Sequence, residues 1–470
     1  MKNDNDFSKG SISSNILKLA LPMTLAQLIN ILYNVVDRMY IGRIPGANSL
    51  ALTGVGITFP IITILMAFAN LFGVGGAPLC SIERGKGDNE MAEKIMGNSF
   101  AMLIITGFIL TIVCLVIKEP LLYMFGASSS TFMYADDYIT IYLIGSIFVM
   151  ISLGMNSFIN AQGFAKTGMM TVLLGAIANI ILDPIFIFLF NMGVKGAAFA
   201  TLISQFLSAI WVLKFLTGSK AILTLKRKNF ILDFKLIFKI TCLGFSGFVM
   251  ALTNSLVQIV CNVNLQIYGG DLYVGIMTVI NSIREIIMMP VSGITNGSQP
   301  VMSFNYGAKK YERVKNAIKF TSISCIIYTT GIWIVLKIFP VFFIKLFNDD
   351  VNLINAGVFY MGIYFFGFFM MSFQFAGQST FVALGKSKHA IFFSILRKVI
   401  IVVPLTIMLP KLFNLGITGV FLAEPISNFI GGIACYVTMI FTVWKSLGNN
   451  DENDDTDTRH HHKFSHAYAK

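Results

Sequence analysis

The chain alternates between long apolar runs and short polar segments. Runs without any Asp, Glu, Lys or Arg include 95–117, 138–165, 240–270 and 425–444, and each reaches the about 20 residues that a membrane-spanning helix needs. Ten-residue stretches of alternating polarity, which are typical of a transmembrane barrel, are not seen. The pattern predicts an all-α, polytopic membrane protein. Its twelve predicted transmembrane helices are residues 15–40, 51–78, 94–117, 137–161, 168–190, 195–216, 236–267, 272–300, 316–340, 355–382, 390–410 and 416–444.

The two halves of the chain repeat each other. A shift of 222 residues aligns Gly75 with Gly297 and keeps its register across helices and loops. After one inserted residue, GVKGAAFATLISQF at 193–206 aligns with GITGVFLAEPISNF at 416–429. Six spans per copy is an even number, so both copies enter the membrane with the same orientation, as in transporters built from parallel repeats.

This repeat predicts two pseudo-symmetric lobes of six helices each. We expect the amino lobe at residues 1–225 and the carboxyl lobe at 226–447, with the basic connector 218–235 at the boundary. Residues 448–470 are polar and predict a disordered tail. Two bundles with a cleft between them are the usual basis of alternating access.

The composition agrees with a membrane protein. Of the 470 residues, 55% are hydrophobic and only 12% are charged, against about 25% charged in soluble domains. The net charge of +12 raises the question of nucleic acid, but most Lys and Arg lie in loops on the side of the two termini, as the positive-inside rule expects. We therefore predict a plasma-membrane protein with both termini in the cytoplasm, in contact with the bilayer and not with nucleic acid.

Acidic and amide side chains interrupt the apolar runs of the amino half. A carboxylate inside a span is expensive and is by default a functional candidate. In the fifth predicted helix, Asn179 and Asp183 are four residues apart on one face, and Pro184 frees backbone acceptors nearby. One stripe of the first predicted helix is formed by Gln27, Asn30, Asn34 and Asp37.

These oxygen-bearing groups suit two kinds of chemistry. Burial and a second nearby acid favour the protonated form of a carboxyl group, which suits a proton carrier. The same oxygens could coordinate a hard cation such as Na⁺. The alternatives are structural: Asp37 in an ion pair with Arg38 at the outer headgroup layer, and Asp183 in an interfacial Asp-Pro turn.

The carboxyl half lacks both acids, because the positions equivalent to Asp37 and Asp183 fall near Ile259 and Leu405. Arg284 and its neighbour Glu285 are either an internal ion pair or groups that contact substrate. We expect the lobes to differ in function. The candidate substrate-cavity residues are Gln27 and Asn30 of the amino half with Gln258, Asn281, Arg284, Glu285, Gln374, Gln378 and Glu424 of the carboxyl half.

Several segments resemble one transporter family. LPMTLAQLINILYNVVDRMYIG, GVGGAPLCSIERGKGD, ANIILDPIFIF, MGVKGAAFATLISQ and GSQPVMSFNYGAKKYERV are similar to sequences of the multidrug and toxic compound extrusion (MATE) transporters, over residues 14–444. An Asp in the first helix together with Asn-x-x-x-Asp-Pro in the fifth resembles the DNA-damage-inducible-F and Staphylococcus multidrug-efflux branches.

The resemblance implies a MATE-fold antiporter that exports amphipathic organic cations in exchange for H⁺ or Na⁺, without another cofactor, and that functions as a monomer. Coupling would then use Asp37, Asn179 and Asp183, with Thr201 and Tyr138 as neighbours at matching places, and we add Asn34 from the polar stripe. A Na⁺ ion would take Asp37, Asn179, Asp183 and Thr201 as ligands. Some members use acids in the seventh and tenth helices, where this chain has Gln374 and Gln378 in the tenth and no acid in the seventh. The resemblance thus favours coupling through the amino lobe.

Other functions fit the sequence less well. A lipid-linked oligosaccharide flippase of the same superfamily needs intramembrane cations to hold pyrophosphate, and Arg284 is the only clear candidate. A membrane enzyme needs a His/Asp or paired-acid motif at a membrane face, and the only histidine outside the tail, His389, follows GKSK in a predicted loop. We therefore predict a transporter and not an enzyme. A passive channel does not explain the duplication with unequal acids.

Overall fold

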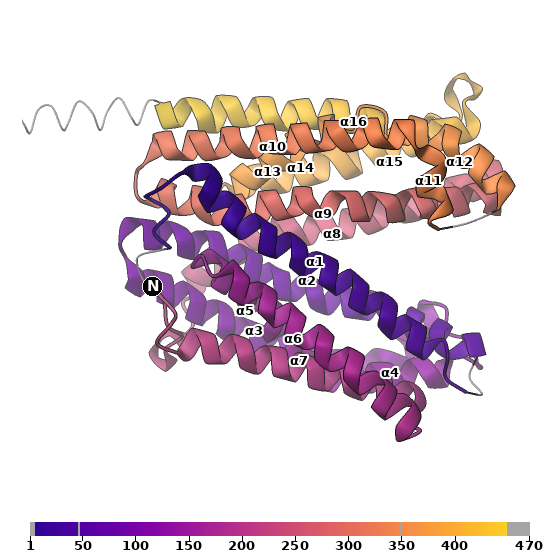
Figure 1. The fold of residues 1–470 in the computed structure, drawn as a ribbon, viewed down its shortest axis with the longest axis horizontal. Coiled ribbons are helices and arrows are strands. Elements are labelled where there is room, and N and C mark those ends of the chain that lie inside the picture. Colours follow the sequence, from indigo (N-terminus) through magenta and orange to yellow (C-terminus); the bar gives the residue numbers. More distant parts are fainter. Residues whose placement is uncertain (1–4, 46–47, 348–349, 449–470) are drawn as a thin grey trace, which may run out of the picture. The chain divides into compact units, whose positions relative to one another are not determined.

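The computed structural model describes residues 5–45, 48–347 and 350–448, and every regular element within these ranges is a helix (Figure 1). The predicted disordered tail begins at the last of these residues, Gly448, and otherwise lies outside the described part of the chain. The all-helical prediction is confirmed. It follows from the length of the apolar runs, because a helix satisfies its own backbone hydrogen bonds inside a bilayer.

The described chain forms two compact units. Unit 1 contains 18–84 and 88–248, and unit 2 contains 7–17, 85–87 and the chain from Val249 onward. The predicted lobe boundary at residue 225 lies before helix α8 (Phe234–Gly269). The structure keeps the first part of α8 with unit 1.

Except for the start of the first helix and the end of the second, which belong to unit 2, the first half of the chain supplies the helices of unit 1. Its elements are α1 (Ile12–Ile41), α2 (Asn48–Lys86), α3 (Asn89–Met124), α4 (Phe132–Ile144), α5 (Ser146–Ala161), α6 (Ala165–Pro184), the π-helix η1 (Ile185–Leu189), α7 (Gly193–Thr217) and the short 3₁₀-helix η2 (Arg227–Phe230).

The second half supplies unit 2, except for the start of α8. Its elements are α8 (Phe234–Gly269), α9 (Asp271–Gly307), α10 (Tyr311–Ile338), α11 (Pro340–Lys345), α12 (Val351–Tyr364), α13 (Met370–Ala383), α14 (Ser387–Ile395), the π-helix η3 (Leu396–Val402), α15 (Val403–Met408), the 3₁₀-helix η4 (Leu412–Asn414), α16 (Gly416–Met439) and the π-helix η5 (Ile440–Trp444).

Within the described residues, ten helical segments are long and apolar enough to cross a bilayer. An eleventh qualifies only as the pair α4 and α5, which is bent by 57°. The shorter apolar helix α12 and its neighbour α13 lie at the repeat position of α4 and α5, because Gly145 aligns with Gly367. The predicted helices 137–161 and 355–382 are therefore each broken in two, near these glycines.

The break between α4 and α5 is tied to α3 by side-chain hydrogen bonds. The Thr111 hydroxyl donates to the Leu143 carbonyl oxygen at 3.1 Å and lies 2.6 Å from the Ser146 hydroxyl. A helix break inside a bilayer leaves backbone groups without water partners. Thr111 therefore adds a side-chain hydrogen bond to the backbone at the break.

Small residues bring α2 and α8 close together in unit 1. A Cβ atom built on Gly244 would lie 1.8 Å from the Leu71 carbonyl oxygen, and one on Gly75 would lie 2.3 Å from the Ile240 carbonyl oxygen. No side chain fits at either place, so glycine permits the helix contact. The core of unit 2 includes the fully buried Phe365, Phe368 and Phe421.

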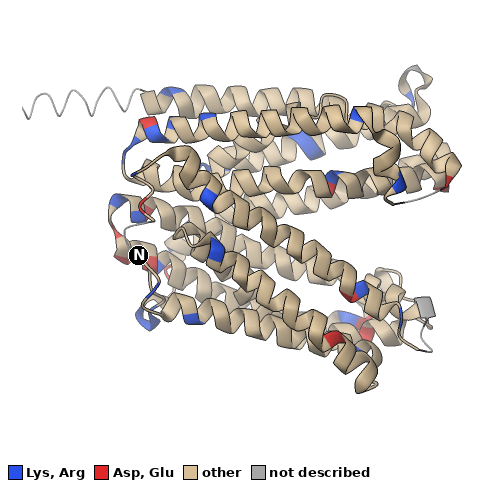
Figure 2. Ribbon diagram, in the orientation of Figure 1, with Lys and Arg blue, Asp and Glu red and all other residues tan. Residues whose placement is uncertain are grey.

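Charged residues gather near the ends of the helices (Figure 2). Several form ion pairs there, such as Lys118 with Asp136 at 2.6 Å and Lys94 with Asp233 at 2.7 Å. Two groups of charges depart from this arrangement, because they are buried within helices. One lies in unit 1 and the other in unit 2.

Candidate functional site

The buried charges of unit 1 are two carboxyl groups. Asp37 on α1 is 9% exposed, and Asp183 near the end of α6 is fully buried. Their side chains interact directly with each other. Pro184 follows Asp183, but the helix continues as η1, so Asp183 lies inside one helical segment that is long enough to span a bilayer.

Three polar side chains surround the carboxyl pair. The Asn179 amide donates to Asp183 Oδ1 at 3.3 Å and to Thr201 Oγ1 at 3.4 Å. The Tyr138 hydroxyl contacts the Thr201 hydroxyl, and the Tyr138 ring stacks on that of Tyr142 at 6.1 Å between centroids. Helices α1, α4, α6 and α7 therefore contribute to one site.

The site contains buried oxygens that have no hydrogen-bond partner. They are Asp37 Oδ1, Asp183 Oδ2 and Asn179 Oδ1. An unsatisfied buried acceptor costs about 1–3 kcal/mol, and a proton or a small hard cation would satisfy several of them at once. No group of three or more His, Cys, Asp and Glu side chains suitable for a metal occurs in the described ranges, so a cation here needs amide or hydroxyl ligands as well.

The geometry argues against the two structural alternatives. Arg38 is exposed, and its guanidinium carbon lies 4.7 Å from the centre of the Phe59 ring, where the cation faces the electron-rich ring. Asp37 is turned to Asp183 instead. The burial of Asp183 is equally inconsistent with an interfacial turn.

The rest of the polar stripe on α1 is used differently. The Asn34 amide donates to the Asn30 carbonyl oxygen at 2.6 Å, one helical turn away. Asn30 is exposed and Gln27 is partly buried. The roles of these three residues in coupling and substrate binding stay predictions.

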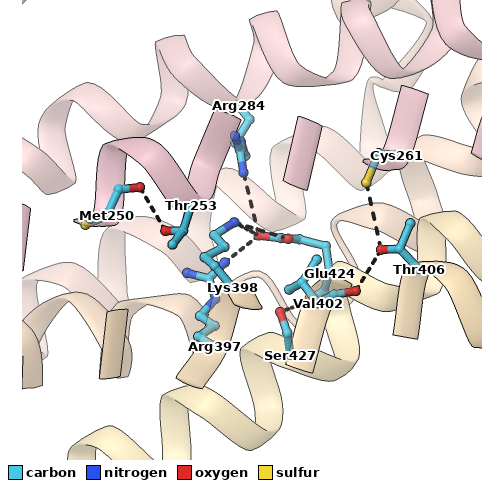
Figure 3. A network of polar contacts seen from close by, with 10 residues as sticks. All are labelled: Met250, Thr253, Cys261, Arg284, Arg397, Lys398, Val402, Thr406, Glu424 and Ser427. Atoms are coloured by element: carbon cyan, nitrogen blue, oxygen red, sulfur yellow. Dashed lines mark hydrogen bonds and ion pairs between the residues drawn. The ribbon is translucent and has the colours of Figure 1, made fainter. Parts of the chain in front are cut away.

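The buried charges of unit 2 are mainly cationic, and Figure 3 shows them converging on one carboxylate. Glu424 on α16 pairs with Arg397, with Lys398 at 3.1 Å and with Arg284 of α9 at 3.6 Å. Arg397 and Lys398 belong to η3 and are only 2% and 5% exposed. Three cations thus share one buried acid.

This cluster corrects the expectation that Arg284 is the only intramembrane cation. Arg397 and Lys398 were expected to belong with the cations of the cytoplasmic loop, although both lie inside the predicted helix 390–410. Their place well inside that helix, together with an acid in the next predicted helix, was the signal that could have identified them. The π-helical backbone that presents two adjacent cations has no comparable mark in the sequence.

Five of the predicted cavity residues line one cavity of about 360 Å³ in unit 2: Gln258, Asn281, Arg284, Glu285 and Glu424. Arg397 and Lys398 line it too.

Gln374 and Gln378 lie outside this cavity. The Gln374 amide donates to Gln378 Oε1 at 3.2 Å and to the Phe393 carbonyl oxygen at 3.4 Å, and the Gln378 amide bonds Ser394. These contacts join α13 to α14 and η3.

Comparisons with known proteins agree with the fold. The sequence profile of the MatE family matches residues 22–185 and 247–408, one segment in each half. The multidrug export protein MepA of Staphylococcus haemolyticus is 26% identical, over 92% of this chain and 94% of its own. MepA of Staphylococcus aureus (strain MSSA476) is 25% identical over 88% and 90%. A crystal structure of MATE in the bent conformation superposes with a TM-score of 0.89 at 21% identity, covering 96% of this chain and 99% of that one.

Proposed function

The chain belongs to the MatE family and is a multi-pass membrane transporter, not an enzyme; on this premise, we propose that it exports amphipathic organic cations in exchange for H⁺ or Na⁺ by alternating access. The MepA relatives are multidrug export proteins, which supports the substrate class. The positive-inside pattern supports a plasma-membrane location with cytoplasmic termini, and we propose that a single chain suffices.

The observation that carries the proposal is the contact between Asp37 and Asp183. Two interacting carboxylates in a buried site cannot both keep a full negative charge at low cost. The pair therefore favours a positive partner, and the oxygens of Asn179 and Thr201 extend the choice from a proton to Na⁺.

Coupling follows if the ion and the substrate cation depend on the same negative charge. A coupling ion that neutralises Asp37 and Asp183 removes their attraction for an organic cation. By linkage, a bound organic cation lowers the affinity for the coupling ion by the same factor. Entry of the ion from outside and release of the substrate are then parts of one exchange. The described residues of unit 2 hold no equivalent acid pair, which favours coupling through unit 1.

The test is ethidium transport in proteoliposomes that contain the full chain, with a pH gradient or a Na⁺ gradient imposed separately. We expect one gradient to drive transport by the parent and to have no effect with Asp37→Asn. The matched control is Asp136→Asn, which removes an acid that is ion-paired with Lys118 at 2.6 Å and is not among the groups that act on the two carboxyl groups. Transport by Asp37→Asn at the parent rate would refute the assignment.

The cations of unit 2 favour a second candidate function, the flipping of a lipid-linked oligosaccharide, because pyrophosphate requires such groups. The same vesicles discriminate between the two. If neither gradient moves ethidium in the parent, and the vesicles instead translocate a fluorescent lipid pyrophosphate, the flippase replaces the antiporter.

A further inference from the structure

The cavity of unit 2 has an excess of buried positive charge. Arg284, Arg397 and Lys398 all pair with the single carboxylate of Glu424. The other acid at the cavity, Glu285, is exposed and acts on Arg284 only through its charge. Buried charges are stable when each is paired and hydrogen-bonded, so this cluster has room for one more anion.

Arg397 provides donors for such an anion. Its guanidinium group has five N–H donors, and its Nε is buried without a hydrogen-bond partner. Its aliphatic stem packs against Gly431, where an added Cβ atom would lie only 3.1 Å from Arg397 Cγ. Arg397 therefore lines the cavity with unused donor capacity, which suits an oxyanion.

The other walls of the cavity suit the rest of an organic molecule. Met277, Met288 and Phe375 are apolar, and Asn254, Gln258 and Asn281 are uncharged and polar. Methionine adapts to different shapes, and a volume of about 360 Å³ lies in the range of small-molecule pockets.

We propose that this cavity is a second binding site, distinct from the carboxyl pair of unit 1, and that it binds an amphipathic organic acid. The carboxylate of the ligand pairs with Arg284, Arg397 and Lys398, so that these cations no longer share Glu424 alone. The apolar part of the ligand lies against the methionines. An organic cation is repelled here and goes to unit 1. The proposal is independent of the coupling mechanism, because it is tested by binding alone.

The test uses the purified full chain in phosphatidylcholine nanodiscs and the fluorescent acid dansylglycine, with empty nanodiscs as background. Dansylglycine methyl ester is the matched probe, because it differs only in lacking the carboxylate charge. A charge-assisted hydrogen bond contributes about 1.5–3 kcal/mol, so we expect the acid to bind at least about tenfold more tightly than the ester. Equal affinities would overturn the proposal.

Three variants locate the binding in the cavity. Arg284→Gln, at the least buried of the three cations, weakens the binding of dansylglycine about tenfold and leaves the binding of the ester unchanged. Glu424→Gln removes the competing carboxylate, so the acid binds more tightly and raises the unfolding temperature by more than in the parent. Lys337→Gln removes an exposed cation that contacts Trp333 outside the cavity and changes nothing. If Arg284→Gln binds the acid as the parent does, or if folded Glu424→Gln loses binding, the cluster is purely structural.

An anionic lipid headgroup is the other source of an oxyanion, and a change of lipid separates the two sources. The affinity for dansylglycine stays the same when phosphatidylglycerol is added to the nanodiscs if the cavity binds a small acid. Displacement of dansylglycine by phosphatidylglycerol would assign the cavity to lipid instead.

Discussion

Units 1 and 2 arise from one repeat, yet their buried charges are of opposite sign. In the alignment of 193–206 with 416–429, Thr201 falls on Glu424. Thr201 contacts Asn179, which bonds Asp183, whereas Glu424 is an acid that pairs with three cations. The duplicated fold thus keeps a polar position on α7 and α16, and the surrounding helices decide which charge collects there.

The π-helices show how the surroundings differ. In unit 1, η1 begins after Asp183 and continues its helix past Pro184; in unit 2, η3 itself carries Arg397 and Lys398. A π-turn inserts a residue into the helical ladder and is frequent at functional sites. The comparison teaches that similar backbones can present acids in one copy and cations in the other.

The largest effect is expected from a substitution in the carboxyl pair of unit 1. Asp183→Asn removes half of the carboxyl pair, and we expect gradient-driven ethidium transport to fall about a hundredfold, the equivalent of roughly 3 kcal/mol. The double variant with Asp37→Asn is no worse than either single variant, because the two residues act as one unit. Additive losses would show two independent sites.

The second effect concerns stability and has opposite signs in the two units. Glu424→Gln leaves three buried cations without their acid, and breaking a buried pair in this way costs about 3–5 kcal/mol. Asp37→Asn removes like-charge repulsion instead. Thermal unfolding in nanodiscs measures both, and we expect a clear fall for Glu424→Gln and no fall for Asp37→Asn. Equal falls would mean that the units treat their acids alike.

A smaller effect sharpens the comparison at the shared repeat position. Thr201→Val removes the hydroxyl that accepts from Asn179, and Thr201→Ser keeps it. We expect the valine variant to raise the half-saturating concentration of the coupling ion about threefold to tenfold, in line with a lost hydrogen bond of about 1 kcal/mol. The serine variant should match the parent, and a shift of equal size in both would exclude a role for the hydroxyl.

The smallest effect comes from an ion pair in water. Lys94, with the backbone N–H of Leu236, holds the pKa of Asp233 below its usual range. A carboxyl group with a lowered pKa in the folded state stabilises the fold at pH values above its unfolded-state pKa of about 3.9. This contribution disappears as the pH falls through the folded-state pKa. Thermal unfolding of Asp233→Asn should therefore be close to that of the parent at pH 7, with the difference vanishing as the pH falls below the folded-state pKa of Asp233. A large fall in the unfolding temperature at pH 7 would contradict the prediction that exposed ion pairs contribute less to stability than the buried charges do.

Much of the fold could be predicted because a membrane helix has a simple pattern. The predicted helix 195–216 corresponds to α7 within two residues at its start and one at its end. The breaks near Gly145 and Gly367 were missed because the apolar runs continue through them. In a bilayer, a turn needs no polar residue if neighbouring side chains satisfy its backbone, so the sequence carries no mark of it.

The candidate sites were predictable to different degrees. Asp37, Asn179 and Asp183 were identified because such side chains are rare in apolar runs. Thr201 was added only through the family resemblance, since a threonine in a membrane helix is common. Arg397 and Lys398 were missed because they were grouped with the cations of the preceding loop, which are normally a topology signal. Their role depends on Glu424, which lies elsewhere in the sequence.

The hydrogen bonds of Thr111 bear on how the chain enters the membrane during synthesis. The bent pair α4 and α5 leaves a polar break inside an apolar segment, and its side-chain partner comes from α3, which the ribosome makes first. The partner is therefore already available when the bent segment emerges. In a chain with the opposite order of these elements, the bent segment would be made before its partner on α3. We therefore expect the linear order of the helices to favour insertion of the bent segment.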